Sequence, residues 1–305
     1  MNSPFRGVIP PLVTPLTASG ELDLASLERL IARLLDGGVH GIFALGSSGE
    51  VAFFDDDMRA RVLDAVTGIV ADQVPVLAGC IDMQTHRVIS HVRAAEKAGV
   101  AGVVVTAPFY AITGPEEVRH HFTAIGEAAN VPVLAYDIPV CVHTKLSPEM
   151  LMDLAQSGAI VGVKDSSGDD VSFRRLALQN RTLGEPLALF TGHEVVVDGA
   201  YLSGAHGCVP GLGNVDPAGY VRLHTAAQAG DWEQVRLEQD RLAQLMEIAF
   251  APVGKVGPAA GVGSFKTALH LLGVFDTNTM SAPMTALEGS NVDAVHDVLC
   301  RVGLL

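Results

Sequence analysis

Lys164 is the residue whose type and setting point most directly to chemistry. It lies in residues 161–166, Val-Gly-Val-Lys-Asp-Ser, whose valines predict a strand. Strand side chains alternate, so Lys164 shares a face with Gly162 and the two valines share the other. In a closed barrel whose valines pack on helices, the amine would point inward, lose hydration and act as a Schiff-base nucleophile. The alternative is a lysine that reaches out of the strand end toward a carboxylate such as Asp165.

Two other segments with reactive side chains follow predicted strands. Residues 46–50 read Gly-Ser-Ser-Gly-Glu, and small hydroxyls between glycines that run into a helix offer N–H and O–H donors to a carboxylate. Residues 136–139 read Tyr-Asp-Ile-Pro and place a phenol at a strand end. Each has an ordinary alternative: a serine N-cap with Glu50 in the first helical turn, and Tyr136 as a core residue.

Composition predicts a large globular protein. The chain has 305 residues, 49% of them hydrophobic and 18% charged, which favours an extensive core over disorder. Barrel domains of about 250 residues plus extensions fit this length. The formal net charge of −14 argues against nucleic acid and anionic membranes as partners, because both repel an acidic surface.

The cysteines and the first residues indicate the compartment. Cys80, Cys141, Cys208 and Cys300 stand far apart without a CxxC pair, which is typical of reduced thiols in a cytoplasm. The start, Met-Asn-Ser-Pro-Phe-Arg, has no apolar run, so no secretory signal is expected. The uncharged stretch 98–115 contains several glycines and prolines and favours a buried strand with its loop over a membrane span.

Short buried-type runs alternate with amphipathic segments over the first 215 residues, which predicts a parallel sheet covered by helices, either a closed barrel or an open doubly wound sheet. Helix-to-strand joints carry glycine at Gly38, Gly99 and Gly158, where a left-handed residue would end each helix. After about residue 215 only helices are predicted. The predicted strands are Gly7–Thr14, Gly41–Leu45, Val76–Ala78, Gly102–Val105, Val133–Tyr136, Ile160–Lys164, Leu187–Phe190 and Gly207–Val209. The predicted helices are Leu24–Leu35, Asp57–Val70, Gln84–Lys97, Pro115–Ala128, Pro148–Gln156, Asp169–Gln179, Glu194–Leu202, Asp216–Gly230, Asp231–Phe250, Gly261–Leu272 and Ser290–Val302.

These motifs together resemble the dihydrodipicolinate synthase and N-acetylneuraminate lyase superfamily of Schiff-base aldolases. The resemblance covers nearly the whole chain and rests on Pro-Leu-Val-Thr-Pro at 11–15, the loop 46–50, Tyr-x-Ile-Pro at 136–139 and Gly-Val-Lys-Asp at 162–165. It implies an α/β fold: a (β/α)₈ TIM barrel over residues 1–230 with a C-terminal three-helix extension over 231–305. It also implies a homotetramer built as a dimer of dimers.

The resemblance also implies a mechanism. Lys164 would condense with the ketone of pyruvate or another 2-oxo acid, and Tyr136 would move protons to the imine and the substrate hydroxyl. The covalent imine would replace any cofactor or metal. The other lysines (Lys97, Lys145, Lys255 and Lys266) are poorer candidates, because they fall on a polar helix face, in a loop or in the helical tail.

Further residues match positions of the family's site. Ser47 and Ser48 match its paired hydroxyls, and Ser48 would hold the substrate carboxylate. Val209 matches a position whose backbone flanks pyruvate. Tyr110, in Phe-Tyr at 109–110, matches an aromatic residue that reaches into the neighbouring subunit's site, and it would complete a proton relay with Tyr136 and Ser47.

One position departs from the family's synthases. They carry an arginine two residues after the Tyr-x-x-Pro motif, and it grips the carboxylate of a semialdehyde substrate. The equivalent residue here is Cys141, whose neutral thiol cannot replace a guanidinium. The nearest cationic types, His143 and Lys145, are out of register.

Polar residues after the sixth and seventh predicted strands suggest the substrate. Ser166 and its neighbour Ser167 follow the sixth strand, and Gly192, His193 and Glu194 follow the seventh, where sugar-acid aldolases of the family bind hydroxyls. The alternatives are first-turn helix stabilisation for Glu194 and a solvent-facing loop position for His193. The favoured function is cleavage of a 2-keto-3-deoxy sugar acid to pyruvate and an aldehyde.

Other functions stay open. Relatives with the same lysine and tyrosine include 4-hydroxy-tetrahydrodipicolinate synthase and keto-deoxy sugar acid dehydratases, and a non-catalytic 2-oxo acid binding protein is a further alternative. A metal-dependent aldolase or hydrolase using His120, His121, His193 or His206 is less favoured, because no HxH or HExxH spacing occurs. A nicotinamide enzyme is also disfavoured, since neither Gly-Leu-Gly at 211–213 nor Gly-Val-Gly at 261–263 continues as GxGxxG.

Overall fold

The computed structural model describes residues 4–305 and contains one eight-stranded parallel sheet. The strand order is β1-β8-β7-β6-β5-β4-β3-β2, so each strand from β2 to β8 lies beside its neighbour in sequence. The strands are β1 (Gly7–Val8), β2 (Ile42–Ala44), β3 (Val76–Gly79), β4 (Gly102–Thr106), β5 (Val133–Asp137), β6 (Gly162–Asp165), β7 (Ala188–Thr191) and β8 (Gly207–Cys208).

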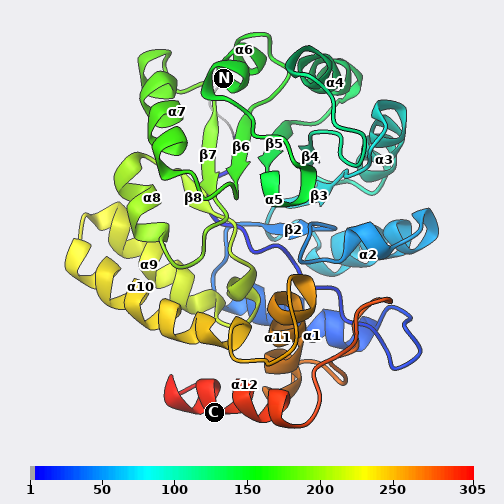
Figure 1. The fold of residues 1–305 in the computed structure, drawn as a ribbon, viewed down its shortest axis with the longest axis vertical. Helices are drawn as coiled ribbons and strands as arrows, with labels where there is room; N and C mark the ends of the chain where they lie inside the picture. Colours follow the sequence, from blue (N-terminus) through cyan, green and yellow to red (C-terminus); the bar gives the residue numbers. More distant parts are fainter. Residues whose placement is uncertain (1–3) are drawn as a thin grey trace.

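The sheet curls into a TIM-barrel-like arrangement with helices outside it (Figure 1). Beyond β1, Pro11 forms an isolated parallel bridge with Phe43 of β2, which joins the two outer strands of the sheet order. The strand predicted over Gly7–Thr14 is too long, because Pro10 and Pro11 have no N–H to donate to a ladder. The Pro10 carbonyl still accepts a hydrogen bond from the Phe43 N–H at 3.0 Å, which keeps this segment beside β2.

Helices follow the strands, as the alternating pattern predicts. Their apolar faces pack on the sheet, and acidic N-caps mark several starts: Asp55 accepts from the Met58 N–H at 2.8 Å, beside the acidic run of the sequence. The glycine joints adopt the left-handed conformation, with φ of 77° at Gly38 and 82° at Gly99. These helices are α1 (Leu24–Asp36), α2 (Asp56–Val70), α3 (Thr85–Lys97), α4 (Pro115–Ala128), α6 (Pro148–Gln156), α7 (Asp170–Thr182), α8 (Val197–Ser203) and α9 (Pro217–Ala229).

The chain after residue 230 is helical and lies together beside the barrel, yellow to red in Figure 1. It contains α10 (Trp232–Met246), the short 3₁₀ turn η3 (Glu247–Ala249), α11 (Pro258–Leu271) and α12 (Ser290–Arg301). α10 packs on α9, and α11 packs on η3, α12 and the 3₁₀ turn η2 (Gly211–Asn214) that follows β8. Helix α11 therefore reaches the barrel end where the strands finish.

Three local predictions need correction. The loop 46–50 does not open a helix: Glu50 is left-handed at φ 60°, the 3₁₀ turn η1 (Val51–Phe53) follows, and α2 begins only at Asp56. The helix predicted from Glu194 begins at Val197, because Glu194 turns its carboxyl group to the backbone of Leu212. A short helix, α5 (Pro139–Val142), follows β5 where only a loop was expected.

The uncharged stretch 98–115 forms the buried strand β4 and its loop, as its glycines and prolines predict. Within residues 4–305, no helix combines the length and the apolar character needed to cross a bilayer.

Close backbone contact between β3 and the end of β2 makes Gly79 irreplaceable. A Cβ atom there would lie 1.9 Å from the Leu45 carbonyl oxygen, which cannot rotate away. We expect Gly79→Ala to lower the free energy of unfolding by about 2–3 kcal/mol, because the backbone must shift. Denaturant unfolding followed by circular dichroism measures it.

Gly68→Ala is the matched control for this substitution. Gly68 is exposed within α2 with nothing within 4 Å of its Cβ position, so alanine should stabilise the helix by about 0.5–1 kcal/mol. Equal effects at both glycines would contradict the close approach of β2 and β3.

Candidate active site

The Lys164 amino group lies inside the barrel. Lys164 on β6 pairs in register with Tyr136 on β5, so the two side chains project from the same face of the sheet. Its Nζ lies 4.0 Å from the centre of the Tyr136 ring and 5.0 Å from that of Phe43 on β2. Lys164 is 5% exposed and Tyr136 3%. The inward orientation predicted from strand alternation is present.

Aromatic and small residues complete this interior level. Phe190 on β7 is the other register partner of Lys164 and is fully buried. A Cβ on Gly207 would lie 2.8 Å from the Phe190 ring, so the glycine leaves room for it. The amine therefore lies among aromatic rings, and in a setting of such low polarity the electrostatic interactions of any charge are stronger than in water.

The residues that follow Tyr136 and Lys164 form a separate ionic network. Asp137 is fully buried and contacts the Lys145 Nζ, which also lies 3.9 Å from the Asp165 Oδ2. Burial raises the pKa of Asp137 to about 6, although its pairing with Lys145 acts in the opposite direction. Asp165 thus meets Lys145, and the alternative in which Lys164 reaches out to Asp165 is wrong. Lys145 joins the carboxyl ends of the two strands that carry Tyr136 and Lys164.

Ser48 and Glu194 meet at one glycine of η2. A Cβ on Gly211 would lie 2.8 Å from the Glu194 Oε1 and 3.3 Å from the Ser48 Oγ. The Glu194 Oε1 also accepts a hydrogen bond from the Leu212 N–H at 2.9 Å. Burial raises the pKa of Glu194 to about 7, against the opposing effects of the Leu212 and Gly211 N–H groups and the Lys164 charge. A hydroxyl and a readily protonated carboxyl group therefore lie against the same short turn.

Polar residues at the ends of β6 and β7 also meet. A Cβ on Gly192 would lie 2.0 Å from the Ser166 Oγ, so Ser166 occupies the space that this glycine leaves free. Val209 is 5% exposed and donates its N–H to the Thr191 carbonyl at 2.8 Å. Its backbone N–H is thus already used.

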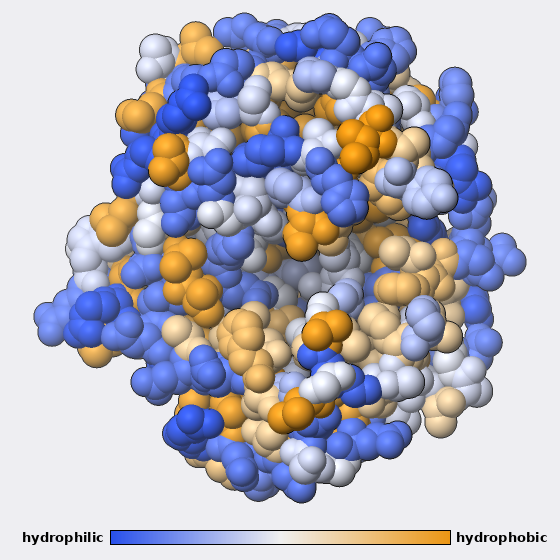
Figure 2. All heavy atoms as spheres, in the orientation of Figure 1, coloured by the Kyte–Doolittle hydropathy of each residue, from blue (hydrophilic) through white to orange (hydrophobic). Residues whose placement is uncertain are grey.

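The remaining predicted site residues lie at the surface. Ser47 is exposed, and Tyr110 is 89% exposed with a left-handed φ of 70°. Cys141 has an exposed surface on α5; partial loss of water around its thiol raises the pKa, and the charge of Lys164 opposes that rise. Figure 2 shows this face of the molecule hollowed between α5 and α11, in the orientation of Figure 1.

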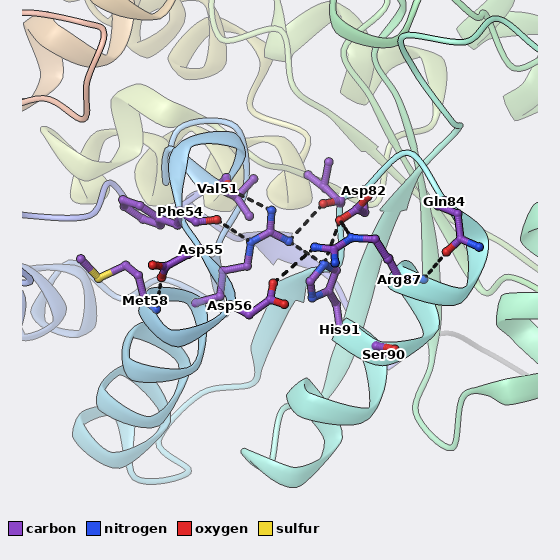
Figure 3. Close-up of polar contacts among 12 residues, drawn as sticks. Val51, Phe54, Asp55, Asp56, Met58, Asp82, Gln84, Arg87, Ser90 and His91 are labelled. Carbon is purple, nitrogen blue, oxygen red and sulfur yellow. Dashed lines mark hydrogen bonds and ion pairs between the residues drawn. The ribbon is translucent and has the colours of Figure 1, made fainter.

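A polar cluster between α2 and α3 supports the chain beyond the serine loop (Figure 3). Arg59 donates to the carbonyl oxygens of Val51 at 3.1 Å and Phe54 at 3.3 Å, and its Nη1 lies 2.9 Å from the His91 Nε2. Asp82 accepts from Arg87 and contacts His91 in the same cluster. These contacts fix η1 and thereby one end of the loop 46–50.

Comparison with known proteins places the chain. The sequence profile of the dihydrodipicolinate synthetase family matches residues 4–301. The chain belongs to this family. Members are aldolase-type lyases that work through a lysine Schiff base, and this chain is such a lyase.

Its relatives are similar over nearly their full length. The chain is 31% identical to the 4-hydroxy-tetrahydrodipicolinate synthase of Phenylobacterium zucineum, over 95% of both chains. It is 33% identical to an uncharacterized DapA-like lyase of Halobacterium salinarum, over 99% of this chain and 95% of the relative.

Solved structures of the family have the same fold. The dihydrodipicolinate synthase of Bacteroides thetaiotaomicron superposes with a TM-score of 0.92 at 30% identity, over 99% of this chain and all of that one. YagE, a family protein from Escherichia coli K12 solved with pyruvate, superposes at 0.93 with 25% identity, again over 99% and 100% of the two chains.

The histidines considered for a metal site lie apart in this member of the family. His121 contacts Thr85 and the Thr106 carbonyl, and His206 accepts from the Leu189 N–H. A solvent-facing loop position is one sequence-based alternative for His193, but the residue is partly buried in the structure. Among residues 4–305, no three His, Cys, Asp or Glu side chains converge in a metal-binding group.

Sequence reasoning missed two parts of this site. Phe43 lies over the Lys164 amine but comes from an ordinary apolar run in β2, which carries no signal of its role. The network of Lys145, Asp137 and Asp165 had a signal, because an aspartate follows both Tyr136 and Lys164 at a strand end. Carboxylates repeated at such positions predict a shared cation on the outer face.

Glu194→Gln tests the buried carboxyl group through stability. The folded chain keeps a proton on Glu194 up to a pKa of about 7, whereas the unfolded chain loses it near the ordinary value of 4.5. The folded state binds more protons between these values, so this group makes the free energy of unfolding fall as pH rises from 4.5 to 7. The glutamine variant should therefore gain on the order of 3 kcal/mol of unfolding free energy relative to wild type between pH 4.5 and 8.

Glu233→Gln on the exposed start of α10 is the control. The difference in the free energy of unfolding between Glu194→Gln and wild type should vary with pH more than that between this control and wild type. If Glu194→Gln behaved in the same way in denaturant titrations across this pH range, Glu194 would be an ordinary ionised carboxylate.

Proposed function

We propose that this chain is a pyruvate-dependent class I aldolase in which Lys164 forms the Schiff base and Tyr136 moves the protons. The observation that carries the proposal is the buried amine 4.0 Å from the Tyr136 ring, at the carboxyl ends of β5 and β6. The place of the amine at this end of the barrel fits the proposal, because TIM-barrel enzymes carry out their chemistry at the carboxyl ends of the strands.

The reaction proceeds in balanced steps. The Lys164 amine in its neutral form attacks C2 of a 2-keto-3-deoxy acid, and Tyr136 gives its proton to the departing hydroxyl, so that water leaves, a protonated imine forms and Tyr136 becomes a phenolate. Tyr136 takes the proton of the C4 hydroxyl as the C3–C4 bond breaks, the aldehyde leaves, and the bonding electrons pass to the imine as an enamine. Protonation at C3 and hydrolysis then release pyruvate and regenerate the amine, so no further cofactor is needed.

Ser48 and Glu194 would orient the substrate. We assign the substrate carboxylate to the Ser48 hydroxyl and the turn at Gly211, with Ser47 and the Val209 backbone flanking it. A second anion is better tolerated beside Glu194 while that carboxyl group keeps its proton, which its pKa of about 7 allows. Ser166 and Gly192 would contact the hydroxylated part of the substrate.

Cys141 favours a substrate without a second carboxylate. A thiol offers no charge-assisted pair to an anion. The nearby Lys145 is engaged with Asp137 and Asp165, so it is not free to replace an arginine at position 141. A hydroxylated 2-keto-3-deoxy sugar acid fits these groups. A keto-deoxy sugar acid dehydratase would use the same Lys164 and Tyr136.

The second candidate function is 4-hydroxy-tetrahydrodipicolinate synthase. Several relatives about 30% identical to this chain carry that name. The synthase is the less favoured function because Cys141 stands where the synthases carry an arginine.

We propose a cytoplasmic homotetramer in which residues 1–230 form the catalytic barrel and 231–305 a helical extension. Tyr110 supports a partner subunit: it is 89% exposed on a strained backbone, a state that a contact with another subunit would explain. In such an assembly Tyr110 would complete the relay with Tyr136 and Ser47 across the interface.

A panel of 2-keto-3-deoxy sugar acids tests the aldolase directly. We expect pyruvate release, measured with a coupled dehydrogenase, from at least one of them, and loss of the rate by about 10³-fold or more in Lys164→Arg. Lys97→Arg on the exposed end of α3 is the matched control and should turn over normally. No pyruvate from any substrate would place the dehydratase or the synthase first.

Cys141→Arg separates the aldolase from the synthase. A guanidinium at this position gives an anionic semialdehyde a charge-assisted hydrogen bond of about 1.5–3 kcal/mol, so kcat/KM for its condensation with pyruvate should rise by about 10-fold or more. Cys300→Arg, exposed on α12, should leave it unchanged. Efficient condensation by wild type, slowed by Cys141→Arg, would favour the synthase.

A further inference from the structure

A fully buried ion pair joins the serine loop to the C-terminal helices. Glu50 ends the loop 46–50, and its Oε2 contacts the Nζ of Lys266 in the middle of α11. Neither side chain has any exposed surface. Lys266 was predicted as an unremarkable tail lysine, but it is among the largest fully buried residues of the described chain.

The backbone around residues 279–281 satisfies both charges. The Glu50 Oε1 accepts from the Ser281 N–H at 2.8 Å, and Lys266 donates to the Thr279 carbonyl at 2.9 Å. Taking two charges out of water costs free energy that can exceed the gain from their attraction, so such a pair is weak evidence for stability. Its use lies in fixing one geometry, because neither charge can be moved without losing its partner.

The geometry it fixes is unusual. Glu50 adopts φ 60° and ψ 26°, the left-handed region that a residue with a Cβ rarely occupies. Such a conformation persists where the surroundings hold it. Ser48 lies two residues before it, and the Thr14 hydroxyl donates to the Gly49 carbonyl at 2.9 Å between them.

Helix α11 also lies against the turn at Gly211, which Ser48 and Glu194 approach. Phe265 precedes Lys266, and a Cβ on Gly211 would lie 2.8 Å from its ring. α11 therefore contacts the Ser48 side through Glu50 and the Glu194 side through Gly211. Arg59 holds the chain beyond η1, so the ion pair is the link from the loop to the helices after residue 230.

We propose that Glu50 and Lys266 are positioning residues for the carboxylate pocket, through which α11 sets the place of Ser48 relative to Gly211. This rests on the proposed function, in which Ser48 holds the substrate carboxylate. The helices after residue 230 are then part of the binding site and not an accessory. Breaking the pair should weaken carboxylate binding while the amine chemistry of Lys164 continues.

Pyruvate alone is the probe, because enamine formation removes a methyl proton and reprotonation in D₂O adds deuterium. The rate of methyl deuteration, followed by proton NMR against pyruvate concentration, gives kcat and KM. In Glu50→Gln/Lys266→Met, which leaves no unpaired charge, we expect the Tm to stay near wild type. KM for pyruvate should rise by about 10-fold with kcat changed less than about 3-fold, as lost uniform binding requires.

Single variants and a second ion pair complete the design. Glu50→Gln and Lys266→Met alone should lose more stability than the double variant, since each leaves one buried charge. Arg222→Met/Glu238→Gln removes the pair between α9 and α10, away from the loop, and should leave KM unchanged. Glu50→Asp keeps the charge but shortens its reach, and it should raise KM even if the double variant folds poorly.

The outcomes separate the two proposals. A wild-type KM in both the double variant and Glu50→Asp would overturn the positioning role. No Lys164-dependent deuteration in wild type would instead overturn the proposed function. In that case, hydrogen exchange at the Gly49 and Val51 amides still tests the positioning role. The exchange should be faster in the double variant than in the Arg222→Met/Glu238→Gln control. Equal exchange rates would contradict the role.

Discussion

One constraint underlies the proposed chemistry: a primary amine must be kept inside the protein without a carboxylate paired to it. Lys164 is 5% exposed, and among residues 4–305 its side chain forms no ion pair. A carboxylate beside it would hold the amine as an ammonium, which is no nucleophile. The rings of Tyr136 and Phe43 cover it instead.

The alternation of side chains along a strand keeps the Lys164 amine apart from the neighbouring carboxylates. Asp137 and Asp165 directly follow Tyr136 and Lys164, the pair proposed to be catalytic, yet they point to the outer side of the sheet and meet Lys145 there. The same two strands thus carry the Lys164 amine on the inner face of the sheet and an ionic network on the outer face. Burial also acts at the proposed carboxylate site, where it raises the pKa of Glu194 to about 7.

Local rules predicted much of the fold. Proline at the first helical position fixed the starts of α4 and α6, and alternation placed Lys164 inward because it depends only on neighbouring residues. Contacts between distant segments were beyond this reasoning. The pairing of Glu50 with Lys266, and the meeting of Ser48 with Glu194, join residues whose separate contexts look ordinary, so the loop 46–50 was wrongly predicted to enter a helix.

Borohydride reduction in the presence of pyruvate, followed by mass spectrometry of the digested protein, tests the central claim most directly. The account predicts one reduced pyruvate on the peptide that contains Lys164, and none in Lys164→Arg. An adduct on Lys145 or Lys266, or no adduct under conditions in which the wild-type chain turns over, would contradict it.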